Sequence, residues 1–160
     1  MLEVIVLFPV IAILLAAVIE FGLLLSGIKH VQASSRAGAK IASELSQADL
    51  GGADAVNVDV VKDTVDRVLS SAGFESCQVI LENVTTGCVA DNTRNSGTCT
   101  GCNAPATSLP TVAAVPGGTV RVTVCVDADQ LTPDLLSTFG FDISSKIISA
   151  STSLPFENCP

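Results

Sequence analysis

The most reactive side chains in this sequence are six cysteines, all of which follow residue 76. They are Cys77, Cys88, Cys99, Cys102, Cys125 and Cys159. An even number of cysteines in a small domain is typical of a disulfide framework formed in an oxidising compartment. We therefore expect all six to be oxidised. Either Cys99 is bonded to Cys102, or both join the segment 91–118 to a neighbouring strand.

Cys99 and Cys102 also have the spacing of a zinc-ligand pair, a haem attachment site or a redox dithiol. Zinc needs further ligands, but no second close pair follows and the single histidine, His30, is remote in sequence. Haem attachment needs a histidine directly after the second cysteine, where Asn103 stands. A redox dithiol is favoured at a helix N-terminus, whereas this pair lies in a segment rich in Pro, Thr and Asn. Disulfides are the favoured interpretation, with buried or reactive thiols as the alternative.

The sequence contains no pattern typical of catalysis. A Ser-His or Cys-His pair within the C-terminal part is excluded, because the one histidine adjoins the apolar N-terminal segment. Gly117 and Gly118 precede a strand instead of forming a phosphate-binding loop. Asp127 and Asp129 could hold a cation, but exposed turn carboxylates are the better interpretation. We expect no enzyme activity, no metal and no cofactor.

Asn83 begins an N-glycosylation pattern and is a candidate modification site.

A long apolar segment stands at the N-terminus. From Val4 to Ile19 there is no charge and no hydroxyl, and the apolar run resumes after Glu20 as far as Ile28. About 25 helical residues at ~1.5 Å each span roughly 37 Å, enough to cross a ~30 Å hydrocarbon core. We therefore predict a membrane helix. A cleaved secretory signal is disfavoured, because no basic residue precedes Lys29 and the apolar stretch is too long.

The same helix is predicted to continue beyond the apolar segment. Residues 29–47 contain no proline and favour helix. Small and apolar residues recur there at three- and four-residue spacings, which predicts a stripe for close packing. We expect one helix of about 45 residues, ended by Gly51 and Gly52.

The predicted orientation of this helix conflicts with the cysteines. Lys29, Arg36 and Lys40 all follow the apolar segment, so the positive-inside rule places the remainder in the cytoplasm. Disulfides require the opposite side. Removal of a short basic leader before Met1 would resolve the conflict and leave the C-terminal part exported.

The remaining sequence predicts a small α+β head. Valines and leucine on one face predict a helix over 58–69, in which Asp63 and Arg67 would form an i, i+4 ion pair. Alternating residues predict strands over 77–84 and 119–126 and a last strand within 143–154. We expect residues 91–118 to form a long loop. The predicted fold is a long N-terminal hydrophobic helix, 1–50, and a disulfide-stapled head, 51–160, with a helix packed on antiparallel sheet.

The head is strongly acidic. The whole chain has a formal net charge of −8, and after residue 40 five basic residues stand against fourteen acidic ones. Such a surface repels nucleic acid phosphates, so we expect no nucleic acid partner.

Two carboxylates in the apolar segment remain to be explained. Glu3 lies at a helix N-terminus, which favours negative charge. In a bundle of such helices it would need a cationic partner, and the ammonium group of Met1, in the same or a neighbouring subunit, supplies one. Pro9 removes a helix hydrogen bond and permits a kink.

Glu20 allows two interpretations. Left at the bilayer centre, a carboxylate would cost about 2.5–3.5 kcal/mol. It either reaches the membrane interface or pairs with Lys29 or Arg36 of another helix.

These N-terminal residues resemble the TadE/TadF-like pseudopilins of tight-adherence pilus systems, which are relatives of type IV pilins. The resemblance rests on Glu3 followed by Pro9, then Glu20-Phe21-Gly22, then the Ala/Ser-rich residues 33–43. It implies removal of a leader by a prepilin peptidase, storage in the cytoplasmic (inner) membrane and incorporation into a pilus by its assembly machinery. It also implies that Glu3 pairs with the N-terminus of a neighbouring subunit. The family's glutamate usually lies further from the processed terminus, so either cleavage differs here or Met1 is not the mature end.

We therefore expect a structural, pilin-like subunit of an extracellular filament, a homopolymer with helices 1–45 in its core. Two alternatives stay open: a minor pseudopilin that primes or caps a pilus, and a monomeric membrane-anchored module that presents residues 91–118 to a ligand.

Overall fold

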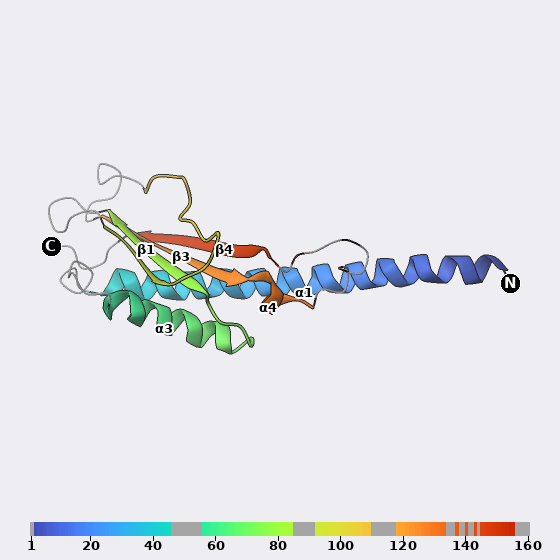
Figure 1. Cartoon of the computed structure of the whole chain (residues 1–160). Coiled ribbons are helices and arrows are strands. Elements are labelled where there is room, and N and C mark those ends of the chain that lie inside the picture. The colour runs from blue at the N-terminus through green and yellow to red at the C-terminus, as the bar shows by residue number, and fades with distance from the viewer. Residues whose placement is uncertain are drawn as a thin grey trace.

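The computed structural model describes the chain except for residues 1, 46–55, 85–91, 110–117, 134–136, 138–139, 141–142, 144 and 156–160. Its elements, in chain order, are helix α1 (Leu2–Glu44), helix α3 (Val56–Ser70), strands β1 (Gln78–Val84), β2 (Asn92–Gly97) and β3 (Thr119–Asp127), the short helix α4 (Ala128–Leu131) and strand β4 (Ile147–Pro155). The α+β class is confirmed: a long apolar helix leads into a small antiparallel sheet with two disulfides, a pilin-like layout (Figure 1).

The sheet has four strands in the order β2-β1-β3-β4, and every neighbouring pair is antiparallel. Strand β3 is central, as expected for its run of β-branched residues. Its alternate valines face α1, and Thr119, Arg121, Thr123 and Cys125 on the other face are buried as well. The strand is therefore covered on both sides.

The core forms where α1 and α3 meet the sheet (Figure 1). Small residues on α1 allow this close approach, as the sequence predicted. A Cβ atom at Gly38 would lie 2.8 Å from Val65 Cγ2 and 3.2 Å from Val122 Cγ1. Ala39 and Ala42 beside it are fully buried. The core thus combines residues of α1 with residues of the head. It therefore spans the domain boundary that was predicted at residue 50.

Strand β2 corrects the prediction that all of 91–118 is loop. Its sequence, NTRNSG, has no apolar residue, so no periodicity marks it. It is an edge strand whose pairing with β1 ends at Gly97, opposite Gln78. Gly97 has φ of 85°, and a Cβ there would lie 2.3 Å from the carbonyl oxygen of Cys77. Only glycine fits this close approach, which leads the chain to Cys99.

The ion pair on α3 also differs from the prediction. Lys62 Nζ pairs with Asp66, whereas no ion pair between Asp63 and Arg67 is found among the described residues. Asp66 lies where it also accepts hydrogen bonds from Ser76. The tertiary contact therefore decides which i, i+4 pair forms.

Candidate assembly site

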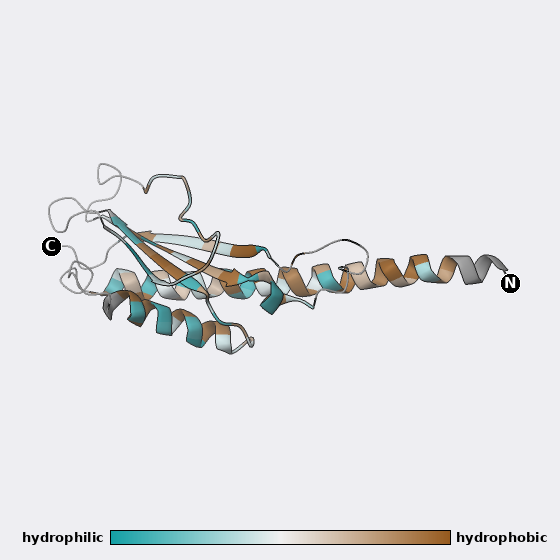
Figure 2. Cartoon of the chain, viewed as in Figure 1, coloured by the Kyte–Doolittle hydropathy of each residue, from teal (hydrophilic) through white to brown (hydrophobic). Residues whose placement is uncertain are grey.

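Helix α1 has two halves with opposite exposure. Large apolar side chains are solvent-exposed through residues 7–25; Phe8 is 72% exposed and Val18 is 70% exposed. From Val31 onward one face of the helix is buried in the head. We call residues 2–26 the projecting half and residues 27–44 the packed half. Figure 1 shows the projecting half extending beyond the sheet and α3, and Figure 2 shows that residues 7–26 of it are mostly hydrophobic.

The two halves meet at contacts with the head. A Cβ at Gly27 would lie 2.7 Å from side-chain atoms of Leu131 on α4, so a glycine lets α4 approach the helix. The rings of His30 and Phe74 lie edge to face with centroids 6.2 Å apart. The helix is continuous through this point, so no linker separates the two halves.

The projecting half is an unusually large apolar surface. Among the described residues, Val60 is the one exposed large hydrophobic outside α1. Removing a Leu, Val or Phe side chain from water stabilises by about 1.5–3 kcal/mol when burial is complete. A contiguous patch of this kind marks contact with lipid or with another protein. By length and composition α1 is compatible with membrane insertion.

The predicted assembly residues are distributed along this helix. Met1 lies outside the described residues, and Glu3 is described only as part of the helical backbone. Pro9 lies inside α1, which continues through it. Lys29 and Arg36 are exposed in the packed half.

Glu20 is the exception in the projecting half. It is only 5% exposed, while Ile19 and Phe21 on either side are 54% and 61% exposed. Glu20 takes part in an interaction within the chain. Glu20 is thus already engaged in the single subunit, a situation that neither sequence interpretation anticipated.

The disulfides bind the segment after β2 to the sheet. Cys77 is bonded to Cys99, with Cα atoms 5.5 Å apart, and Cys102 to Cys125, with Cα atoms 6.0 Å apart. Of the two predicted pairings, the one that joins this segment to neighbouring strands is confirmed. Cys88 and Cys159 lie outside the described residues. Closing loops of this length stabilises by about 3 kcal/mol each in the chain-entropy model.

Residues 98–109, which we call the strap, cover the outer face of the sheet. Arg121 Nη1 donates to the carbonyl oxygen of Thr107 at 2.6 Å, and Leu109 is buried. The guanidinium of Arg121 also donates to both carboxylate oxygens of Glu82. Sequence reasoning missed this pair, because the register that brings the two residues together is not visible in either strand alone.

Asn83, the glycosylation candidate, lies in β1 and is 4% exposed. Among the described residues its Nδ2 has no hydrogen-bond partner. The folded head therefore does not offer this amide to a modifying enzyme.

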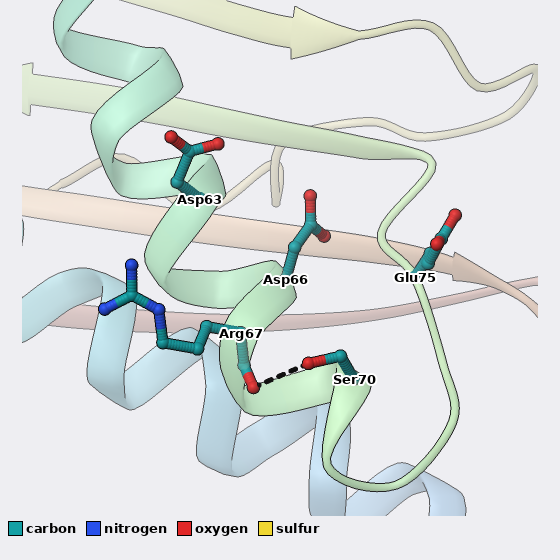
Figure 3. Close-up of a pocket in the computed structure, with 5 residues that line it drawn as sticks. All are labelled: Asp63, Asp66, Arg67, Ser70 and Glu75. Carbon is teal, nitrogen blue, oxygen red and sulfur yellow. Dashed lines mark hydrogen bonds between the residues drawn. The ribbon is translucent and has the colours of Figure 1, made fainter.

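Several carboxylates line a shallow hollow beside α3. It is lined by Asp63, Asp66, Arg67, Ser70 and Glu75 (Figure 3). Partial burial alone would raise the pKa of Asp66, but hydrogen bonds from Lys62 and Ser76 outweigh it and lower that pKa. Figure 3 shows the Asp63 carboxylate and the Arg67 guanidinium pointing in different directions, and no ion pair joins them among the described residues.

Comparisons with protein-family models, with characterised proteins and with solved structures found no match to this chain.

Proposed function

We propose that this protein is a pilin-like structural subunit of an extracellular filament, and that it has a structural role and not a catalytic one. The observation that carries the proposal is the exposed apolar surface of the projecting half, continuous in one helix with the packed half. Before assembly the cytoplasmic membrane covers this surface. In the filament, the projecting halves of neighbouring copies cover it.

The continuity of α1 favours a filament over a simple membrane anchor. An anchor tolerates a flexible connection to its head, whereas a polymer with regular symmetry needs each head held in one orientation on its tail. Here Gly27 against Leu131 and His30 against Phe74 fix the head where the helix leaves it. The acidic, disulfide-bonded head suits the outer surface of such a polymer.

Assembly would follow the steps that the family resemblance implies. A prepilin peptidase processes the chain, the assembly machinery extracts it from the membrane, and Glu3 pairs with the N-terminal ammonium of a neighbouring copy. A buried carboxylate without such a partner is strongly unfavourable, so this pairing would set the register between subunits.

Electron microscopy and mass spectrometry of material sheared from the cell surface test the proposal. We expect thin filaments in which this chain is the main component. A trace amount in filaments built of another protein would support the minor pseudopilin. Retention of the whole population in the membrane as monomers would contradict the filament role and favour the anchored binding module.

A further inference from the structure

A groove with a basic rim opens between the packed half of α1 and strand β4. We call it the basic groove; its lining residues are Arg36, Lys40, Ser43, Thr152, Leu154 and Pro155. Ser35 Oγ and Thr152 Oγ1 share a hydrogen bond of 2.8 Å that joins the two walls. Arg36 is exposed, and the Lys40 side chain is 71% exposed. Lys40 Nζ lies 3.8 Å from Glu44 Oε1, a surface pair that leaves the amine accessible.

This groove is unusual for its charge. The chain has eight basic residues against sixteen acidic ones, so two exposed cations side by side stand out against an acidic surface. Leu154 and Pro155 make the groove partly apolar between them. It suits a partner surface that combines carboxylates with an apolar side chain.

The hollow beside α3, described above, has the complementary character, and we call it the acidic face. Asp66 is engaged by Lys62 and Ser76, but among the described residues the carboxylates of Asp63 and Glu75 make no hydrogen bond or ion pair. Figure 3 shows Asp63 and Glu75 on either side of Asp66, with the Arg67 guanidinium pointing away from Glu75. Val60, one helical turn from Asp63, is 43% exposed.

The two surfaces lie at different edges of the head. Helix α3 contacts β1 and the edge strand β2, and Ser96 Oγ of β2 donates to Asp59 of α3. The basic groove adjoins β4, the opposite edge of the sheet. One copy therefore does not bring its own two surfaces together, but two copies can.

We propose that the acidic face of one copy docks in the basic groove of a second copy, an inference that rests on the filament role proposed above. Asp63 and Glu75 approach Arg36 and Lys40, and Val60 packs toward Leu154. Each copy carries both surfaces, so each engages two neighbours through a heterologous contact. Contacts of this type produce an open helical polymer when the rotation between neighbouring copies does not close a ring. The head, and not the tail alone, would then select the neighbouring subunit.

A carbodiimide tests the contact directly, because it couples a lysine amine to a carboxylate only where the two groups touch. The full-length chain is treated both in membranes and in sheared surface material, and the covalent dimer is mapped by mass spectrometry. We expect Lys40 linked to Asp63 or Glu75. Lys40→Arg is the matched control: it keeps the charge, and so the docking, but removes the amine and the link.

Charge-reversal variants provide a second test of the contact. Arg36→Glu should lower the yield of the Lys40–Glu75 link roughly fivefold or more, because an attraction becomes a repulsion. Adding Asp63→Arg should restore it. Both residues are exposed, so circular dichroism should show an unchanged fold.

The outcomes separate the two proposals. Dimers linked through Lys40 without filaments would support the docking contact and overturn the filament role. Filaments with links that map elsewhere, or with none, would overturn the docking contact alone. Loss of the link in Arg36→Glu without recovery in the double variant would also count against it.

Discussion

Arg121 and Glu82 face each other as partners across β3 and β1, and Arg121 Nη2 and Nε lie 2.9 and 2.6 Å from the two Glu82 carboxylate oxygens. Their side chains are only 7% and 15% exposed. The same guanidinium donates to the carbonyl oxygens of Pro105 and Thr107 in the strap. One side chain therefore joins two strands and the segment that covers them.

Arg121→Ala should destabilise the head by about 3–5 kcal/mol, because it leaves the Glu82 carboxylate buried without its cation. The double variant Arg121→Leu/Glu82→Leu should recover part of that loss. Chemical denaturation of the detergent-solubilised chain measures both. Lys62→Ala breaks a more exposed pair and should cost about 1 kcal/mol or less. Equal losses in the Arg121 and Lys62 variants would contradict this account of the strap.

The cysteine framework predicts a specific peptide map. Under non-reducing conditions, digestion should yield peptides joined through Cys77 and Cys99 and through Cys102 and Cys125. The double variant Cys77→Ser/Cys99→Ser should lose about 2–5 kcal/mol of stability. Free thiols at these positions in the native protein would remove the evidence for an oxidising compartment.

Two glycines of α1 should respond in opposite directions to alanine. Gly38→Ala forces its new methyl group against Val65 and Val122 and should destabilise by about 1–3 kcal/mol before helix propensity offsets part of it. At Gly22 no side chain or other segment among the described residues lies within 4 Å of a new Cβ, so Gly22→Ala should stabilise the helix by up to about 1 kcal/mol. Thermal unfolding in detergent compares the two, and a neutral Gly38→Ala would mean that α1 packs less closely than described.

Because of Asp66, the free energy of unfolding should depend on pH in the acid range. Its folded pKa is lower than the ordinary value of 3.8, so its contribution is present above that value and is lost as pH falls through the folded pKa. At neutral pH, Asp66→Asn should cost about 1–2 kcal/mol, since hydrogen bonds to a charged acceptor are lost. The difference between variant and wild type should shrink below pH 3.8. Denaturation curves across pH 2–7 test this, and a constant difference would refute it.

Glu3→Ala should leave the protein folded and membrane-inserted but strongly reduce filament formation. The head lies at the other end of α1, so its folding does not depend on this residue (Figure 1). The substitution removes the carboxylate that pairs with the N-terminal ammonium of each incoming subunit. Leaving that ammonium buried and unpaired costs several kcal/mol per added subunit. Glu3→Asp should be intermediate. The control is Asp129→Asn, an exposed carboxylate on α4. Normal filament yield from Glu3→Ala would favour the plain membrane anchor.

The spacing of apolar residues along the sequence was enough to predict most of the described helices and strands. Helix α3 and strands β1, β3 and β4 stand where apolar residues recur at helical or strand spacing, and α1 stands where a continuous apolar run leads into a stripe of small residues. Strand β2 was missed because backbone pairing and Gly97, not apolar burial, hold it at the edge. The choice between two disulfide patterns needed the sheet register, which brings Cys125 to the residues that precede β1.

The candidate site was predictable in outline but not in its contacts. The apolar projecting half follows from composition, since it buries little within the subunit. The burial of Glu20 does not, because it depends on tertiary packing that the local sequence of α1 does not encode. The basic groove combines α1 with a strand more than a hundred residues later in the chain, as the bond between Ser35 and Thr152 illustrates.

The unbroken path of α1 has a mechanical consequence. A tensile load between a tail held among its neighbours and a head held at the surface would run along one helix, with no flexible joint to extend first. To strip the head from that helix, Gly38 would have to slide past Val65 and Val122, a shearing movement that disrupts many side-chain contacts at once. The strap and its two disulfides brace the far face of the sheet against the same force. If the tail is held in a filament as proposed, a pull on the head would therefore be carried by the α1 backbone and by the close packing at Gly38.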